Sequence, residues 1–434
     1  MSKRDKNNDN MEMHLDVYSD RSELHLEDRV MVYHEGFQNL ETQKRYELIN
    51  STLSDGYLEK LMEEIENEDF DSLSDENKAL LKDLVAGITS EVGRALVGVA
   101  FLQLTIKSIV PEQSVRLHKG ATRRGSFSWV NGISMRTIDS SYITPFLRQN
   151  GLLNVNKYGV FMTRSLAENY PYSKLYKAEM RGPFDEWINL VDAIENDTMP
   201  AQKGLCFLMA LLKNRSDDFR NKADIAIKKV ELHKSDSFEK ILGLMKQFFN
   251  STGYSARAFE VTMHGFMQAL EELNLLGDYS LVPMSQMRSA NKKHGNIGDI
   301  ELKDGRVIVE SWDAKYGKPY LRDELEELDD KILASPGVKI AGFVVEQEPD
   351  RRKEITDRVA DISAVTGVEI KVLSFDEWIE WQTTKLLPEQ LNEVGYHWLL
   401  AVVESFGQRR LEIAPIDEPC DAWISDLIRL MEEK

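Results

Sequence analysis

The stretch GNIGDIELKDGRVIVESWDAKYGK, residues 295–318, decides the fold that this chain is expected to adopt. Two apolar runs flank the tetrapeptide Lys-Asp-Gly-Arg at 303–306, and an Asp-Gly pair between such runs is typical of a hairpin turn. A hairpin brings Asp299, before the first run, toward Asp313, at the end of the second. Asp313 and Lys315 are two residues apart, so on a strand they point to the same face. The sequence therefore predicts two carboxylates and one ammonium group at one edge of a sheet.

These residue types indicate a metal site. Asp299 and Asp313 offer the oxygen ligands that Mg²⁺ prefers, and Mg²⁺ keeps several waters when it is bound. Such a metal ion would activate a water molecule and neutralise developing negative charge. Lys315 would orient the water or offset negative charge in the transition state. The alternative is that the three residues are solvated acids and a surface lysine at strand ends.

Helices and strands are expected to alternate on both sides of the hairpin. Upstream, residues 256–276 are expected to form a helix because apolar side chains recur on one stripe, and residues 280–287 a strand. Downstream, the expected elements are a helix over 321–333, a strand over 338–346, a helix over 352–366, a strand over 368–373 and a helix that begins near residue 376. Alternation of this kind predicts an α/β core.

In these residues the chain resembles the PD-(D/E)xK nucleases, and most of all the type II restriction endonucleases. Asp299 takes the place of the first acidic residue of the motif, and Asp313-Ala-Lys315 that of the (D/E)xK tripeptide; Gly298 stands where the motif has proline. The resemblance covers roughly residues 251–385. It implies a restriction-endonuclease-like core, in which a mixed central sheet is flanked by helices. It also implies a further carboxylate on the preceding helix, for which Glu260 is the candidate, with a solvent-facing glutamate as the alternative.

The resemblance implies a catalytic role for Asp299, Asp313, Lys315 and Glu260, with Mg²⁺ as the cofactor and Mn²⁺ as a substitute. The expected enzyme is a type II site-specific deoxyribonuclease that cuts double-stranded DNA. Its expected partners are a second copy of the chain, because a two-fold dimer matches a palindromic site, and a cognate DNA methyltransferase as a genetic partner. Two alternatives remain open: a non-catalytic DNA-binding or regulatory protein, and a repair nuclease of the same fold that cuts by structure.

The charge of the chain is uneven. The formal net charge is −19, which argues against a protein that binds nucleic acid over its whole surface. Residues 111–136 nevertheless hold five basic side chains against one acidic one. Local basic clusters on an acidic chain are typical of a single DNA-facing surface, with an ordinary solvated face as the alternative. The expected DNA contacts are Arg116, Lys119, Arg123, Arg124, Arg288, Asn291, Lys292, Lys293 and Arg322.

Three regions are expected along the chain. Residues 1–250 would form a mainly helical region for DNA recognition, dimerisation or both, residues 251–385 the nuclease core, and residues 386–434 helices packed on the core. Residues 1–30 are polar and are expected to be disordered at the start. Helices are expected over 58–66, 79–109, 143–150, 160–168, 184–195, 201–212 and 219–228. The third and fourth of these could form a helix-turn-helix, with ordinary helical packing as the alternative.

Several other functions lack a sequence signal. The chain has no phosphate-binding GxxxxGK[ST] loop, no GxGxxG fingerprint and no GxSxG elbow, which leaves ATP-driven, dinucleotide and serine-hydrolase functions without support. Its two cysteines, Cys206 and Cys420, lie far apart, so neither a disulfide framework nor a zinc cluster is indicated. No apolar run is long enough to span a bilayer, and a cytoplasmic location is expected.

Overall fold

The structure is a computed structural model that describes residues 13–26, 29–88, 91–122, 127–162, 164–180, 182–284, 296–318, 320–407 and 419–433. The chain divides into two compact units, unit 1 (Met1–Asp217) and unit 2 (Asp218–Lys434). Within the described ranges, no helix combines the length and the apolar character needed to cross a membrane.

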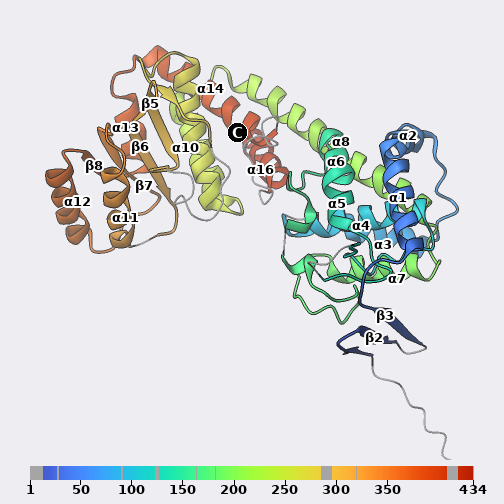
Figure 1. Ribbon diagram of the computed structural model, residues 1–434. Coiled ribbons are helices and arrows are strands. Elements are labelled where there is room, and N and C mark those ends of the chain that lie inside the picture. The colour runs from blue at the N-terminus through green and yellow to red at the C-terminus, as the bar shows by residue number, and fades with distance from the viewer. Residues whose placement is uncertain are drawn as a thin grey trace, which may run out of the picture. The chain divides into compact units, whose positions relative to one another are not determined.

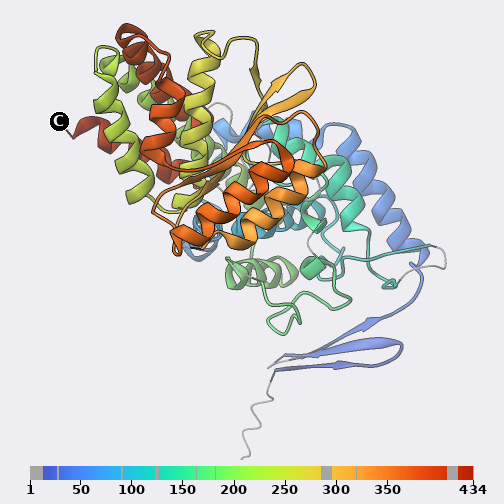
Figure 2. The ribbon, with the colours of Figure 1, turned by 90° about the vertical axis from the view of Figure 1, so that its left-hand side faces the viewer.

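Unit 1 combines a small sheet with a helical core. Strands β1 (His14–Val17), β2 (Arg21–His25) and β3 (Val30–His34) pair antiparallel in that order, and Figure 2 shows them as adjoining ribbons. The helices are α1 (Leu40–Ser54), α2 (Tyr57–Glu64), α3 (Asp75–Ala86), α4 (Glu91–Ile109), α5 (Met135–Ile138), α6 (Thr144–Gln149), α7 (Phe184–Glu195) and the first part of α8 (Ala201–Val230). Their apolar faces meet in one core, to which α4 contributes along most of its length.

The helices of unit 1 differ from the expected ones at three places. The helix expected over 79–109 is two helices, because α3 ends at Ala86. The helix expected over 160–168 consists of two 3₁₀ turns, Val160–Met162 and Arg164–Ala167, so these residues do not form a recognition helix. The buried carboxylate of Asp139 accepts the backbone N–H of Val160 at 2.8 Å, which holds the first turn against the core. The helices expected over 201–212 and 219–228 are one continuous helix, α8.

Unit 2 is built on a mixed sheet, as the alternation of helices and strands predicts. Strands β4 (Ser280–Leu281), β5 (Ile300–Asp304), β6 (Val307–Lys315), β7 (Ile340–Val345) and β8 (Glu369–Ser374) lie in sequence order. The pairs β4–β5 and β5–β6 are antiparallel, and β6–β7 and β7–β8 are parallel. The helices are α9 (Phe238–Ser251), α10 (Ser255–Glu272), α11 (Arg322–Leu333), α12 (Arg352–Thr366), α13 (Phe375–Thr383), α14 (Pro388–Gly407) and α16 (Cys420–Glu432).

Helices cover both faces of this sheet (Figure 1). Val344 packs into a core with α9, α10, α13, α14 and α16, whereas its neighbours Phe343 and Val345 pack into a second core with α11 and α12. This division follows from the alternation of side chains along a strand. Ala223 and Ala226, near the end of α8, belong to the first core. Unit 2 therefore begins before the boundary expected at residue 251.

Gly298 lies so close to β6 that a side chain does not fit. A Cβ at this position would lie 2.7 Å from both Ser311 Oγ and the Trp312 carbonyl oxygen. The Gly298 N–H also donates to Glu301 Oε1 at 3.4 Å, a hydrogen bond that proline cannot make. The next residue, Asp299, donates its own N–H to the Trp312 carbonyl at 2.9 Å. The close approach at Gly298 thus places Asp299 against β6.

Substitution of Gly298 by alanine tests this close approach. We expect Gly298→Ala to lower the free energy of unfolding by about 1–3 kcal/mol, because the new Cβ forces the backbone away from β6. The matched control is Gly243→Ala in α9, where a Cβ meets no atom within 4 Å. Alanine is favoured over glycine inside a helix, so the control should be as stable as the wild type or more stable. Urea unfolding of both variants decides the matter; equal stability of the two would contradict the packing described for Gly298.

Candidate active site

The hairpin brings two aspartates together, as the sequence predicts. Ile300 pairs with Trp312, so Asp299 lies beside Asp313 on the neighbouring strand. The backbone N–H of Ala314 donates to Asp299 Oδ2 at 3.0 Å. The two carboxylates are close enough to share a hydrogen bond when Asp299 is protonated. The two carboxylates therefore converge near the end of β6.

Lys315 lies on the same face as Asp313 and contacts it directly. Its Nζ is 3.0 Å from Asp313 Oδ2 and 3.0 Å from Glu324 Oε2 on α11. The ammonium group also lies 5.5 Å from the centre of the Phe343 ring. Burial alone would lower the pKa of Lys315, but the carboxylates of Asp313 and Glu324 outweigh it and raise the pKa. Lys315 is therefore a charged ammonium group held between two acids.

Glu260 joins the site from α10. The side chain is buried, which excludes the solvent-facing alternative, and its Oε1 accepts a hydrogen bond from Arg257 Nη1 one helical turn earlier. Burial raises the pKa of Glu260, the nearby Arg257 guanidinium lowers it, and the negative charge of Asp313 raises it again. Burial outweighs the arginine, so the pKa of Glu260 lies above its usual range.

Asp299 has the most perturbed carboxyl group of the cluster. Burial raises its pKa well above the usual range, and the charges of Glu260 and Asp313 raise it further. Neighbouring carboxylates disfavour one another's ionisation, and here Lys315 and Arg257 supply two positive charges for three acids. The donor set consists of carboxylate oxygens, which suits a hard divalent ion such as Mg²⁺ or Mn²⁺. Asp299 and Asp313 are the residues that would hold it.

Two residues of this network are absent from the sequence-based prediction. Arg257 precedes Glu260 by three residues, a spacing at which helical side chains meet, so the pair could have been found from the sequence. Glu324 lies nine residues after Lys315 on another element, and no local pattern indicates its contact. Glu324 also accepts a hydrogen bond from Lys318 Nζ at 2.7 Å. Its pKa is lowered by Lys318 and Lys315, which outweigh the effect of burial, and it stays ionised.

Arg116 does not have the role that its charge suggests. Its side chain is 0% exposed, donates to the Tyr172 carbonyl oxygen at 2.7 Å and forms an ion pair with Asp192. A guanidinium in this place stabilises unit 1 and cannot reach DNA, so the DNA contact predicted for Arg116 is wrong. The basic character of residues 111–136 predicts an exposed side chain, whereas Asp192, the partner that Arg116 contacts, lies 76 residues away in the sequence.

Lys119 and Arg322 remain DNA-facing candidates, each already in contact with other groups. Lys119 donates to Asn169 Oδ1 and, with Arg136, lines a cavity of about 280 Å³ in unit 1. Arg322 Nε lies 2.9 Å from Glu326 Oε1 at the start of α11. The other six candidates lie outside the described residues: Arg123, Arg124, Arg288, Asn291, Lys292 and Lys293.

Comparison with known proteins gives no relative: no protein-family model and no curated protein matches the chain. Function is therefore inferred from the geometry of the site.

The raised pKa of Asp299 has a consequence for stability. An unfolded aspartate ionises near pH 4, about its usual pKa of 3.9, so the wild type loses stability as the pH rises above this value toward the raised folded pKa. An asparagine side chain at the same position would carry no charge at any pH. We expect Asp299→Asn to raise the unfolding temperature of unit 2, by about 2–4 °C for each kcal/mol of repulsion removed, and the gain to grow from pH 4 upward.

Thermal unfolding across the pH range, monitored by circular dichroism, measures this gain. Asp278→Asn is the matched control, because Asp278 is an exposed aspartate of the same unit. Saturating Mg²⁺ should raise the unfolding temperature of the wild type and leave that of Asp299→Asn nearly unchanged. A gain that is equal at acidic and neutral pH would show that Asp299 is not under electrostatic strain.

Proposed function

We propose that unit 2 is a metal-dependent nuclease with a restriction-endonuclease-like fold, which hydrolyses phosphodiester bonds of double-stranded DNA. The observation that carries the proposal is the convergence of Asp299, Asp313 and Glu260 with Lys315 at the end of a hairpin in a mixed sheet. Acids in mutual repulsion beside a buried ammonium group serve no evident purpose in a packed core. They are the groups that a hydrolytic phosphate site needs.

The residues of the site have distinct tasks in this reaction. Mg²⁺, when bound by Asp299 and Asp313, supplies Lewis acidity and lowers the pKa of a water molecule, and Mn²⁺ can take its place. Lys315 offers an ammonium group to the scissile phosphate and offsets the negative charge that develops there. Glu260 adds a carboxylate on the side of α10, and Arg257 holds it in place. Glu324 is a positioning residue that holds Lys315.

Sequence-specific cleavage of the type II restriction kind is the role proposed for the whole chain. Unit 1 would contribute to DNA recognition, with Lys119 and Arg136 as the cations that line its cavity. His118 lines the same cavity but is not a cation there, because burial lowers its pKa to about 3. A homodimer would cut both strands of a palindromic site, and a DNA methyltransferase in the same bacterial cytoplasm would protect the host.

Two other functions fit parts of the same geometry. A repair nuclease of the same fold would use identical chemistry but would select branched or damaged DNA, and would not give discrete fragments. A non-catalytic DNA-binding protein would bind DNA with strong salt dependence and would not cut it with any divalent metal ion. The second is disfavoured by the site itself, because carboxylates beside a phosphate weaken simple binding.

Plasmid digestion tests the proposed activity. With Mg²⁺ the wild type should give discrete fragments, and without a divalent ion it should give none. We expect Asp313→Ala and Lys315→Ala each to lower the cleavage rate by at least about 100-fold, because each removes a group that stabilises the transition state. The matched control is Asp304→Ala, which removes an exposed carboxylate at the turn of the same hairpin.

The control should cut at the wild-type rate. Undiminished cutting by both Asp313→Ala and Lys315→Ala would refute the site. Fragments of no fixed length would favour the repair role over restriction.

The role of Glu324 can be separated from that of the groups that contact substrate. We expect Glu324→Gln to lower kcat by about 10-fold and to leave KM unchanged, as is typical when a supporting partner is lost. The negative charge of Glu324 raises the pKa of Lys315, so its removal should move the alkaline limb of the pH–rate profile to lower pH.

Glu327→Gln on the same helix is the control, since Glu327 forms an ion pair with Lys331 at 3.4 Å and lies outside the cluster. If the rate of Glu324→Gln is lower at every pH but the alkaline limb of its pH–rate profile is not shifted, Glu324 does not act through the pKa of Lys315.

A further inference from the structure

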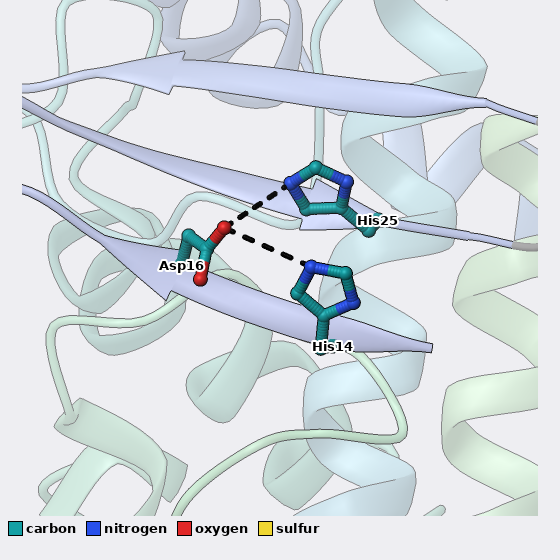
Figure 3. Close-up of side chains that lie close together, drawn as sticks. All are labelled: His14, Asp16 and His25. Carbon is teal, nitrogen blue, oxygen red and sulfur yellow. Dashed lines mark ion pairs between the residues drawn. The ribbon is translucent and has the colours of Figure 1, made fainter. Parts of the chain in front are cut away.

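The sheet of unit 1 carries a second group of metal-binding side chains, far in sequence from the nuclease site. His14 on β1 is directly opposite His25 on β2, and Asp16 follows His14 by two residues. Residues two apart on a strand, and residues directly opposite on paired strands, point to the same face. The register therefore gathers two imidazoles and one carboxylate on one face of the hairpin (Figure 3).

The three side chains are already close enough to share one ion. Asp16 Oδ2 lies 3.4 Å from His25 Nε2 and 3.7 Å from His14 Nε2. Ligand atoms around a tetrahedral zinc ion, each about 2.1 Å from the metal, lie about 3.4 Å apart. The Nε2 atom of His25 is buried and makes no hydrogen bond within the described part of the chain, although it faces the carboxylate. A metal ion would supply the bonding partner that this nitrogen lacks.

We propose that His14, Asp16 and His25 bind a divalent transition-metal ion, with Zn²⁺ as the type case. Two imidazoles and a carboxylate favour Zn²⁺ and its neighbours over Mg²⁺, which requires an all-oxygen set. A further carboxylate is close: Glu23 Oε2 lies 3.9 Å from His25 Nε2, while Glu23 Oε1 accepts a hydrogen bond from Arg21 Nε at 2.6 Å. Water or Glu23 would complete the coordination. The site is independent of the nuclease cluster in residues, in unit and in metal preference.

Binding requires a small rearrangement that the exposure of the site permits. The two imidazole rings are stacked, with centroids 4.1 Å apart and planes 10° from parallel, so their Nε2 lone pairs run side by side. The lone pairs converge on one ion only when a ring tilts. The His14 side chain is 50% exposed and has room to turn, whereas that of His25 is 18% exposed. Since β1 pairs only with β2 within the described sheet, an ion held by both strands would stabilise this edge strand.

Titration of the full-length chain, free of any histidine tag, with Zn²⁺ in a calorimeter tests the proposal. We expect one binding event that persists in saturating Mg²⁺ and that weakens by at least about 10-fold in His25→Ala and in His14→Ala. Titration with Co²⁺ should give visible absorption bands of a low-symmetry nitrogen and oxygen site. Asp16→Asn keeps the shape of the side chain and should weaken binding as well.

The control is His34→Ala, which removes an exposed histidine of the same sheet outside the cluster and should bind as the wild type does. Circular dichroism confirms that each variant is folded. A wild type that binds no Zn²⁺, or equal affinity in the wild type and His25→Ala, would overturn the proposal, as would a loss in His34→Ala equal to that in His25→Ala. Asp313→Ala should keep this binding event, so failure of the nuclease proposal and failure of the zinc proposal are separate results.

Discussion

The mutual repulsion of Asp299, Asp313 and Glu260 is the constraint on which the proposed site depends. Buried like charges are unfavourable, and here they are forced together by backbone contacts: the pairing of β5 with β6 and the approach of Gly298 to Trp312. Lys315 and Arg257 offset part of the cost by ion pairs with Asp313 and Glu260. A cluster of acids that lowers the stability of the fold in this way is characteristic of sites selected for function over stability.

The sequence predicts the core of unit 2 because the signals there are local. A turn with Asp-Gly and an alternation of period two are enough to pair Asp299 with Asp313 and to place Lys315 beside them. Contacts between residues that are distant in the sequence give no local pattern, as the ion pair between Glu324 and Lys315 shows. The error over Arg116 has the same origin, since the partners that bury it come from other parts of unit 1. The polar composition of residues 1–30 predicts disorder at the start, yet β1 and β2 lie there; Leu24 of β2 is buried among polar residues, so the apolar signal is short.

Under the proposed function, electrostatics would also limit how unit 1 binds DNA. The chain carries a net charge of −19, and several basic side chains of unit 1 are already paired with acids, as Arg116 is with Asp192 and Lys107 with Glu195. An acidic protein binds DNA only where a local positive field exceeds the general repulsion. Such a field is short in range under physiological salt, within about 8 Å. Recognition would then depend on a few cations close to the DNA, such as Lys119 and Arg136, and not on broad attraction.

If the proposed function holds, the balance of charge in the cluster of Asp299, Asp313 and Glu260 would favour a divalent ion over a monovalent one. When ionised, the three acids contribute three negative charges, whereas Lys315 and Arg257 supply two positive ones; Glu324 and Lys318 balance each other at the periphery. The deficit is one positive charge, and without metal a proton on Asp299 can supply it. A divalent ion replaces that proton and adds one further positive charge to the site. The single negative charge of a phosphodiester group would cancel that excess, so metal, protein and DNA would reach neutrality only together.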